Sequence, residues 1–573
     1  MVVRYKPTYL KPLLGRSFQV DRSRSFRFPK TSVLIVVLFA VATFSACLAS
    51  PRASLARPST WTYMVYLDAD NDLEDDAILD FLEMSSAGST SNVRIVVQFD
   101  RAPGYDNGYG DWETCKRFLV TPGMTPTAAS AIQDLGEVNM GSEAVLADFL
   151  DWAVKSYPAT HYLLDLWDHG GDWLGLCWDE TASWDYMEMS ELDGALATFQ
   201  TRHHGIQFDV ICLDLCSMGS VEVACQLAPY ASYMVASEIY IPDQGFEYSG
   251  PLSALISDPN MTAPDLCADI LTHYQSYYES LVGTPEWHML NESYELSFVD
   301  LGLVGDLATA ADALATELMD SMKLWVNHIA LARNATEDYD AVSYGDAIDL
   351  LDFARNLRNV TPNATIDSLC DDIEAAVVSC VLGEVHGTNP DNCSVPVNCT
   401  HGMTLYFQSP RLAYDSWYPL SGLTFTDWSQ WDEFLELYQT ELDYGYPTVL
   451  DFAPSGVGVS TDSSIEILFS EEMNPLTLPS AFSIMPTVTG SVYTYPDRLV
   501  FVPDPGSLVP GITYSVVISV AAEDTDGTHL GHNFSWQFTT SAEPIPEFSV
   551  GLLPIIMIMA LVVVVIQRRH AKP

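Results

Sequence analysis

Between residues 60 and 443 the chain alternates short apolar runs with longer stretches in which apolar residues recur every three or four positions. The short runs are typical of buried strands and the longer stretches of amphipathic helices. Their alternation favours βαβ units, so we predict an α/β domain with a mainly parallel sheet flanked by helices. Strands are expected at 63–67, 94–99, 162–167, 210–215 and 233–237, and helices at 72–84, 143–156, 190–201, 220–227 and, as long helices, from 263 to about 334.

A different pattern begins after residue 446, where short β-type runs follow one another without intervening helices. This pattern predicts a β-sandwich over residues 447–541, with strands at 465–469, 491–495, 499–502, 514–520 and 536–539. The segments 469–474 and 536–540 resemble those of Ig-like domains in bacterial and archaeal surface proteins. We expect this domain to be a spacer rather than a partner-binding module.

Both termini carry apolar runs that indicate membrane targeting. Residues 1–50 combine a basic segment with the apolar run 33–49, which is the composition of a signal peptide or, if it is not cleaved, an N-terminal membrane segment. After a linker at 542–549, the apolar run 550–566 is long enough for a transmembrane helix of about 25 Å. Residues 567–573 form a basic tail, which the positive-inside rule places in the cytoplasm. The remaining bulk is therefore predicted outside the cytoplasm, anchored to the cell membrane by one span.

The chain is strongly acidic, with a formal net charge of −51. Residues 51–567 hold 75 acidic and 14 basic side chains, a balance that repels nucleic acid and anionic membranes and attracts cationic peptides. We favour adaptation to the habitat, rather than attraction of the substrate, as the reason for this acidic composition. Eight Asn-X-Ser/Thr sequons agree with an exterior location and make the chain a candidate glycoprotein.

Candidate chemistry lies where two predicted strands end. His169 and Cys216 follow the apolar runs 162–166 and 210–213, and the carboxyl ends of parallel strands share one edge of a sheet. A thiol needs a nearby base to become a nucleophile at neutral pH, and histidine is suited to that role. Gly170 and Gly171 permit close backbone approach, so the amides of Gly170 and Cys216 are candidates to stabilise an oxyanion.

Other acidic residues and cysteines near these motifs allow more than one interpretation of the site. Asp214 lies two positions before Cys216 and therefore either points beside the thiol or caps the following helix. Cys212 competes as the nucleophile but lies deeper in an apolar run, where thiols are usually inert. A zinc site of Cys212, Cys216, Cys225 and His169 lacks any CxxC or HExxH spacing, and we predict no metal site.

Three alternating acids open the first predicted helix. Asp68, Asp70 and Asp72 are spaced like the start of a calcium loop, but Leu73 occupies the glycine position of an EF-hand. The twelfth position is Leu79 rather than glutamate. We therefore expect these acids to cap the helix at 72–84.

Several spaced blocks together resemble the clostripain-type cysteine peptidases. They are residues 66–74, 167–171, 214–218 with Glu222, 237–238 with Gly245 and Tyr248, 344–351, 402–407 and 428–442. The resemblance spans roughly residues 60–443. It implies a caspase-like α/β sandwich, a catalytic His169/Cys216 dyad and cleavage after basic residues. It also implies that Asp214 belongs to the pocket for the basic side chain, with Asp243 as a weaker candidate, and it leaves a calcium requirement open.

We therefore predict an extracytoplasmic, membrane-anchored cysteine endopeptidase that cleaves after Arg or Lys through a thioester intermediate and needs no cofactor. Its expected partners are peptides or proteins with basic residues and, through the C-terminal helix, the membrane. Many enzymes of this type are cut between the two motifs, and the basic residue available there is Arg202. The alternative is a catalytically inactive surface binding or adhesion protein on a peptidase scaffold.

Overall fold

The computed structural model describes residues 59–282, 284, 293–337, 339, 346–387, 397–408, 415–443, 447–525, 527–531 and 533–541. Within this part of the chain, no helix has both the length and the apolar character needed to cross a membrane. The predicted leader at 1–50, the linker at 542–549, the apolar run at 550–566 and the basic tail at 567–573 lie outside the described residues.

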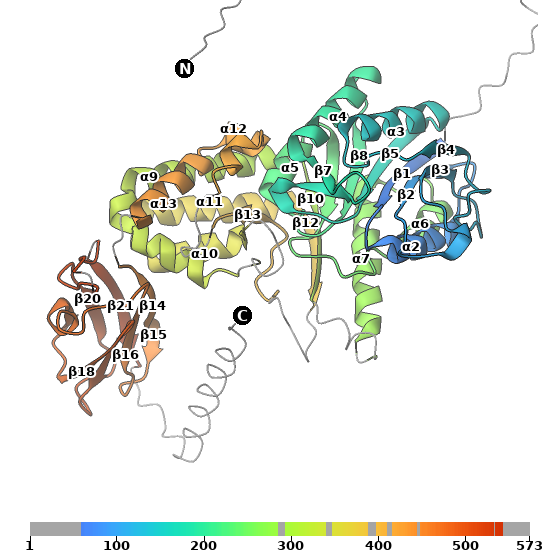
Figure 1. The fold of residues 1–573 in the computed structure, drawn as a ribbon. Helices are drawn as coiled ribbons and strands as arrows, with labels where there is room; N and C mark the ends of the chain where they lie inside the picture. Colours follow the sequence, from blue (N-terminus) through green and yellow to red (C-terminus); the bar gives the residue numbers. More distant parts are fainter. Residues whose placement is uncertain are drawn as a thin grey trace, which may run out of the picture. The chain divides into compact units, whose positions relative to one another are not determined.

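A nine-stranded sheet forms the centre of the N-terminal region (Figure 1), in the order β12-β10-β9-β8-β5-β1-β2-β3-β4. Its strands are β1 (Ser59–Ala69), β2 (Val93–Arg101), β3 (Cys115–Leu119), β4 (Gln133–Gly136), β5 (Ala159–Trp167), β8 (Phe208–Asp214), β9 (Ala231–Ala236), β10 (Tyr294–Asp300) and β12 (Val381–Gly387). The five strands β2, β1, β5, β8 and β9 are parallel, which confirms the five predicted strands and their mutual direction. The pairs on either side of this block are antiparallel.

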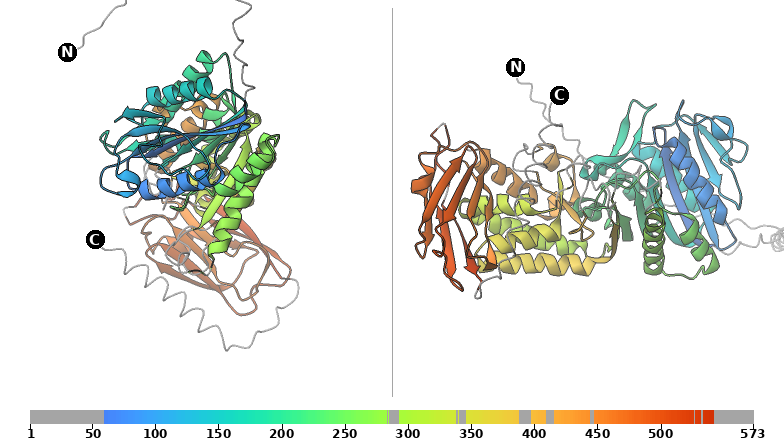
Figure 2. Two further views of the ribbon diagram at one scale, coloured as in Figure 1. Left: turned by 90° about the vertical axis from the view of Figure 1, so that its right-hand side faces the viewer. Right: turned by 90° about the horizontal axis from the view of Figure 1, so that it is seen from below.

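Helices cover both faces of the sheet because its central strands are apolar on both sides (Figure 2). Alternate residues of β1 enter different cores: Met64 and Tyr66 face one core, whereas Tyr63 and Val65 face the other. The first core packs against α3 (Glu143–Ser156), α4 (Met189–Arg202) and α5 (Val221–Leu227). The second packs against α2 (Glu74–Ala87), α6 (Ser249–Ser257) and α7 (Ala263–Leu281).

The region beyond the sheet is mostly helical. Helix α9 (Val304–Ala335) contacts α10 (Leu350–Val360), α11 (Ala364–Cys380) and α13 (Trp431–Asp443), and their buried side chains join the first core. A two-stranded sheet of β11 (Ala347–Asp349) and β13 (Thr404–Tyr406) lies within this region, together with the short helix α12 (Thr424–Trp428). The prediction of long helices from residue 263 is confirmed in part, because β10 interrupts them.

The C-terminal region consists of two four-stranded sheets, in the orders β14-β16-β19-β18 and β15-β21-β20-β17. The strands are β14 (Val449–Ala453), β15 (Gly456–Val459), β16 (Ile465–Phe469), β17 (Phe482–Met485), β18 (Gly490–Tyr495), β19 (Arg498–Pro503), β20 (Thr513–Ile518) and β21 (Phe534–Thr540). Alternate residues such as Ile465, Ile467 and Phe469 are buried, and both sheets contribute to one apolar core. All five strands predicted here are present.

Candidate active site

The loops that follow β5 and β8 form the centre of the candidate site. Trp167 and Asp214 are register partners at the ends of these neighbouring parallel strands, and the Asp168 N–H donates to the Asp214 carbonyl at 3.4 Å. The next residues along each loop therefore leave the sheet side by side. His169 and Cys216 are brought together in this way, two residues beyond the paired strand ends.

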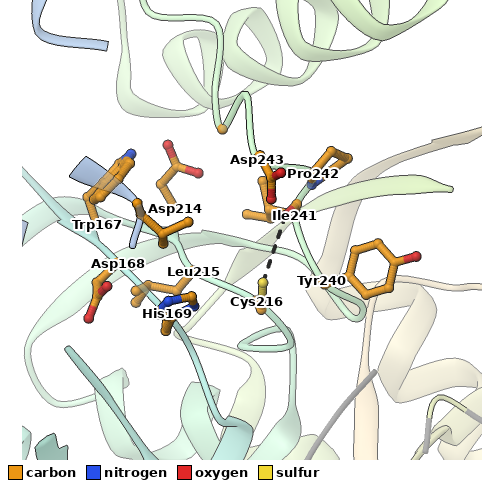
Figure 3. A pocket seen from close by; sticks show the side chains of 12 residues that line it. Trp167, Asp168, His169, Asp214, Leu215, Cys216, Tyr240, Ile241, Pro242 and Asp243 are labelled. Carbon is orange, nitrogen blue, oxygen red and sulfur yellow. Dashed lines mark hydrogen bonds between the residues drawn. The ribbon is translucent and has the colours of Figure 1, made fainter. Parts of the chain in front are cut away.

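His169 and Cys216 line one open cleft of about 370 Å³ (Figure 3), together with Leu73, Trp167, Asp168, Asp214, Leu215, Tyr240, Ile241, Pro242, Asp243 and Gly245. The side chain of His169 is 37% exposed, and Cys216 is half-buried with its Sγ 3.8 Å from the Ile241 carbonyl oxygen. Both side chains are thus within reach of a molecule that enters from solvent. Figure 3 shows the thiol and the imidazole among the side chains that line this cleft.

Backbone geometry fixes the two loops against each other. A Cβ at position 170 would lie 2.2 Å from the Cys216 carbonyl oxygen, so only glycine fits at Gly170. Ser217, directly after Cys216, adopts a φ of 60°, which is unfavourable for any residue other than glycine. Its N–H donates to the Ile239 carbonyl at 2.7 Å and holds this turn in place. The position of the thiol is therefore set by the backbone.

Asp72 contacts His169 directly, with 2.9 Å between Asp72 Oδ1 and His169 Nε2. This finding corrects the expectation that the acids at 68–72 cap the first helix. Helix α2 begins at Glu74, and Leu73 precedes it without any side-chain cap bond. Asp68 and Asp70 are buried, whereas Asp72 reaches the candidate dyad from the loop between β1 and α2.

We expect Asp72 to be a positioning residue for His169, because a carboxylate on one ring nitrogen fixes the orientation of the imidazole. Asp72→Ala should lower kcat about 3- to 10-fold with little change in KM, and Asp72→Asn, which keeps a hydrogen-bonding oxygen, should restore part of the loss. Steady-state kinetics on a basic peptide substrate will measure both constants. The control is Asp75→Ala, an exposed acid in the first turn of α2. Equal losses in Asp72→Ala and Asp75→Ala, or a rise in KM alone, would contradict the assignment.

Asp214 is a buried carboxylate in the wall of the cleft. Its Oδ2 accepts hydrogen bonds from the Phe246 N–H at 3.0 Å and the Tyr248 hydroxyl at 2.9 Å. Burial raises the pKa of Asp214 to about 7 despite these two donors. The end of β8 and the loop after it therefore bring this carboxyl group and Cys216 to the same cleft. Helix α5 is capped by Ser220 and not by Asp214.

A second buried carboxylate lies beside Asp214 and was not found by sequence reasoning. A Cβ built on Gly245 would lie 3.0 Å from Asp214 Oδ2 and 3.1 Å from Asp80 Oδ2, so both carboxylates border the same glycine. Asp80 comes from α2 and accepts a hydrogen bond from the Trp167 indole at 2.7 Å. Burial and the charge of Asp214 raise the pKa of Asp80 well above its usual value. Asp243, by contrast, is exposed in the wall of the cleft.

The competing cysteines are separated by the sheet. Cys212 is fully buried in the core on the side of α7, and Cys225 is fully buried in the opposite core. Burial raises the pKa of both thiols well above the usual value. Cys212, Cys216, Cys225 and His169 therefore do not converge on one metal-binding position. Among the described cysteines near the two motifs, Cys216 is the one in contact with the cleft.

Comparisons with known proteins cover most of the folded chain. The model of the clostripain family matches residues 65–438, and that of the bacterial Ig-like domain matches residues 443–540. Clostripain of Hathewaya histolytica is 28% identical over 218 residues, which is 33% of this chain and 40% of that protein. The chain thus matches less than half the length of this relative.

Solved structures add a similarity of fold. A secreted C11 cysteine protease from Bacteroides thetaiotaomicron, in complex with an irreversible peptide inhibitor, aligns with a TM-score of 0.51 and 19% identity over 65% of this chain and 100% of that one. An inactive zymogen C11 protease from Parabacteroides distasonis aligns with a TM-score of 0.46 and 19% identity over 67% of this chain and 98% of that one. Since the family model matches well over half of the chain, this protein belongs to the clostripain family of cysteine peptidases and carries a bacterial Ig-like domain after the peptidase region.

Proposed function

We propose that this protein is a cysteine endopeptidase that hydrolyses peptide bonds after Arg or Lys, with Cys216 as nucleophile and His169 as general acid and base. The observation that carries the proposal is the arrangement of the cleft. A thiol and an imidazole enter it from neighbouring strand ends, beside the buried carboxyl group of Asp214. Membership of the clostripain family and the predicted caspase-like sheet support the same reaction.

In the proposed acylation step, the Cys216 thiol gives its proton to His169 and the thiolate attacks the substrate carbonyl carbon. A C–S bond forms, and the carbonyl electron pair moves onto oxygen. The N–H groups of Gly170 and Cys216 stabilise the resulting oxyanion, because both lie in the pair of loops that the close contact at Gly170 fixes. The C–N bond then breaks, and His169 protonates the leaving amine.

The second step hydrolyses the thioester. His169, now neutral, removes a proton from water, and the water oxygen attacks the thioester carbonyl carbon. The same two N–H groups stabilise the second oxyanion. Its collapse breaks the C–S bond, releases the carboxylic acid product and returns the thiolate and the imidazolium. No metal or other cofactor is needed for this sequence of steps.

Specificity for basic residues rests on the charge of the cleft. In this proposal Asp214, which lines the cleft, attracts the guanidinium or ammonium group of the residue before the scissile bond. Asp243, which is exposed on the same cleft, adds to the negative potential that a cationic peptide meets on entry. The net charge of −51 acts in the same direction over a longer range.

The location of the enzyme is proposed from the sequence. Residues 1–50 direct export, and the span at 550–566 anchors the chain with its catalytic region outside the cytoplasm. The Ig-like domain at 447–541 then separates the peptidase domain at 60–443 from the membrane. Peptides and proteins with accessible basic residues are the proposed substrates.

Four peptides that differ only in the residue before the scissile bond test the proposed activity. Arginine and lysine carry a positive charge, whereas citrulline and norleucine have similar lengths without one. We expect cleavage after Arg and Lys with kcat/KM at least about tenfold above that for the neutral residues. Mass spectrometry of the products locates the cut bond. Equal rates for all four peptides would contradict the specificity, and no cleavage by folded, reduced protein would favour a binding role.

A further inference from the structure

Two buried acids lie behind the loops that carry the candidate dyad. Asp172 follows His169 by three residues and begins the short helical turn η2 (Asp172–Leu174). Glu222 follows Cys216 by six residues and lies in the first turn of α5. Both side chains are fully buried, and α5 contacts η2 directly. The two acids therefore connect the loop after β5 with the helix that follows the loop after β8.

The two carboxyl groups meet at one hydroxyl group. The Ser220 hydroxyl lowers the pKa of both Asp172 and Glu222, so both carboxyl groups lie close to the same side chain. The Ser220 oxygen also accepts the Val223 N–H as the cap of α5. A hydroxyl group has a single hydrogen, so it serves only one of the two carboxyl groups at a time.

The other donors around the two acids do not satisfy them either. Glu222 Oε1 accepts hydrogen bonds from the Tyr418 hydroxyl at 2.7 Å and the Tyr406 N–H at 3.1 Å. Glu222 Oε2 and both oxygens of Asp172 are buried without any partner that has full hydrogen-bond geometry. Two ionised carboxylates with so few donors are costly, because the buried oxygens have lost their water and gained nothing in return. A proton on one of the two groups supplies the missing donor.

The backbone at Asp172 is in a conformation that glycine adopts more readily. Its φ is 55°, in the left-handed region. The turn is closed by the Gly171 N–H, which donates to the Gly175 carbonyl at 2.9 Å. Glycine at position 172 would fit this backbone without burying an acid. A carboxyl group in a strained and buried position next to the candidate dyad indicates a role for the side chain.

No cation compensates the two acids. Among the described residues, no ion pair brings Lys, Arg or His to Asp172 or Glu222. The titratable groups that face them are Tyr406 of β13, Tyr418 of η3 (Tyr418–Leu420) and Cys225 of α5, and Asp432 of α13 faces Tyr418. None of these groups is a cation. Burial, followed by the charge of Glu222, raises the pKa of Asp172 well above its usual value, and burial raises that of Glu222 to about 7.

We propose that Asp172 and Glu222 share one proton and act as a positioning pair, which ties the loop of His169 to the helix that follows Cys216. In the shared state one acid is neutral and donates its O–H to the ionised partner, so the pair carries a single negative charge. At high pH the proton leaves to solvent, and the two buried charges repel each other and loosen the contact between the loops. The effect on catalysis rests on the proposed function, whereas the shared proton does not.

The melting temperature of the full-length protein as a function of pH tests for the shared proton. An unfolded acid loses its proton near pH 4, whereas the folded pair keeps one until about pH 7. The stability that this proton contributes is therefore complete below about pH 4 and is lost as the pH rises to about 7. Asp172→Asn and Glu222→Gln should each remove the whole of this loss, because the remaining acid ionises normally beside an amide donor. Relative to the wild type, each variant should gain at least about 2 °C between pH 5 and pH 7.5.

The double variant separates a shared proton from two separate ones. With one shared proton, Asp172→Asn/Glu222→Gln gains no more than either single variant. Two independent buried acids would each hold a proton, so each single variant would remove half of the pH dependence and the double variant all of it. That additive result, or equal pH dependence in the wild type and the variants, would overturn the pair. Asp111→Asn is the matched control, an exposed acid with a φ of 47°, and should behave as the wild type.

Two further variants test the positioning role. Asp172→Gly suits the backbone but removes the tie, so we expect kcat to fall about 3- to 10-fold with little change in KM, and Asp172→Asn should restore most of it. The ratio of kcat for Asp172→Asn to that for the wild type should rise as the pH passes about 7, because the dyad affects both proteins alike. Wild-type kcat in Asp172→Gly, or a constant ratio, would overturn the positioning role. If the proposed peptidase activity itself is wrong, the melting temperatures still show the shared proton.

Discussion

Replacement of Cys216 by alanine should reduce kcat/KM for a peptide with Arg before the scissile bond by at least about 10⁴-fold. The variant keeps the cleft and loses only the atom that forms the thioester. His169→Ala should cause a loss of similar size, because the two residues act as one unit and their effects are not additive. Losses of this size are measured by following product formation by the variants over several hours. The wild type is diluted until its rate falls in the same range.

Cys212→Ala is the matched control for this prediction. Its thiol lies within β8, four residues before Cys216, and is fully buried in the core on the side of α7. We expect activity within about threefold of the wild type, after correction for the fraction of folded protein. If Cys216→Ala keeps more than a tenth of the wild-type activity, or if folded Cys212→Ala loses all activity, the assignment of Cys216 as the nucleophile is wrong.

Asp214→Asn should lower kcat/KM for Arg and Lys peptides about 100-fold while the thiol stays reactive towards a small uncharged alkylating agent. The amide keeps the shape of the carboxyl group but no longer attracts a cation. A norleucine peptide, cleaved slowly by the wild type, should lose little in the variant. Asp80→Asn tests the second buried carboxylate in the same assay. We expect a smaller loss of kcat/KM for Arg and Lys peptides, because Asp80 already accepts a hydrogen bond from the Trp167 indole N–H.

The pKa of Asp214 adds a pH signature to the same prediction. Burial raises this pKa to about 7, so the carboxyl group is largely neutral at pH 5 and largely charged at pH 8.5. The ratio of kcat/KM for the Arg peptide to that for the citrulline peptide should therefore rise with pH through about 7. The dyad affects both peptides alike and cancels in this ratio. A ratio that is constant with pH, or that rises equally in Asp214→Asn, would contradict the role of Asp214.

The positions and the parallel direction of the central strands were predictable because each is a short apolar run followed by a helical pattern. β10 was not predicted, since it lies between two long helices and the whole stretch from residue 263 was expected to be helical. Its alternating Tyr294, Leu296 and Phe298, all buried in one core, are the signal that was available. The antiparallel strands β3 and β4 were missed because strands at or near the edge of a sheet are less uniformly apolar, as the exposed Gln133 of the edge strand β4 illustrates.

The candidate dyad was predictable from its position after two strands, whereas its acidic surroundings were not. The acids at 68–72 follow a pattern typical of a helix cap, but the register of β1 with β2 buries Asp68 opposite Asp100. Asp80 is one acid on an amphipathic helix and would ordinarily face solvent. Only the packing of α2 against the sheet places it beside Asp214. The ends of the two strands could thus be predicted from local sequence patterns. Which carboxylates surround them depends on long-range packing.

Covalent labelling of the full-length protein tests the central claim most directly. An acyloxymethyl ketone that carries an arginine side chain is incubated with the wild type, and peptide mapping by mass spectrometry then locates the adduct. The account predicts one adduct, on Cys216, that is prevented by excess Arg peptide and strongly reduced in His169→Ala. No adduct on folded, reduced protein, or an adduct on the exposed Cys399 in place of Cys216, would contradict it.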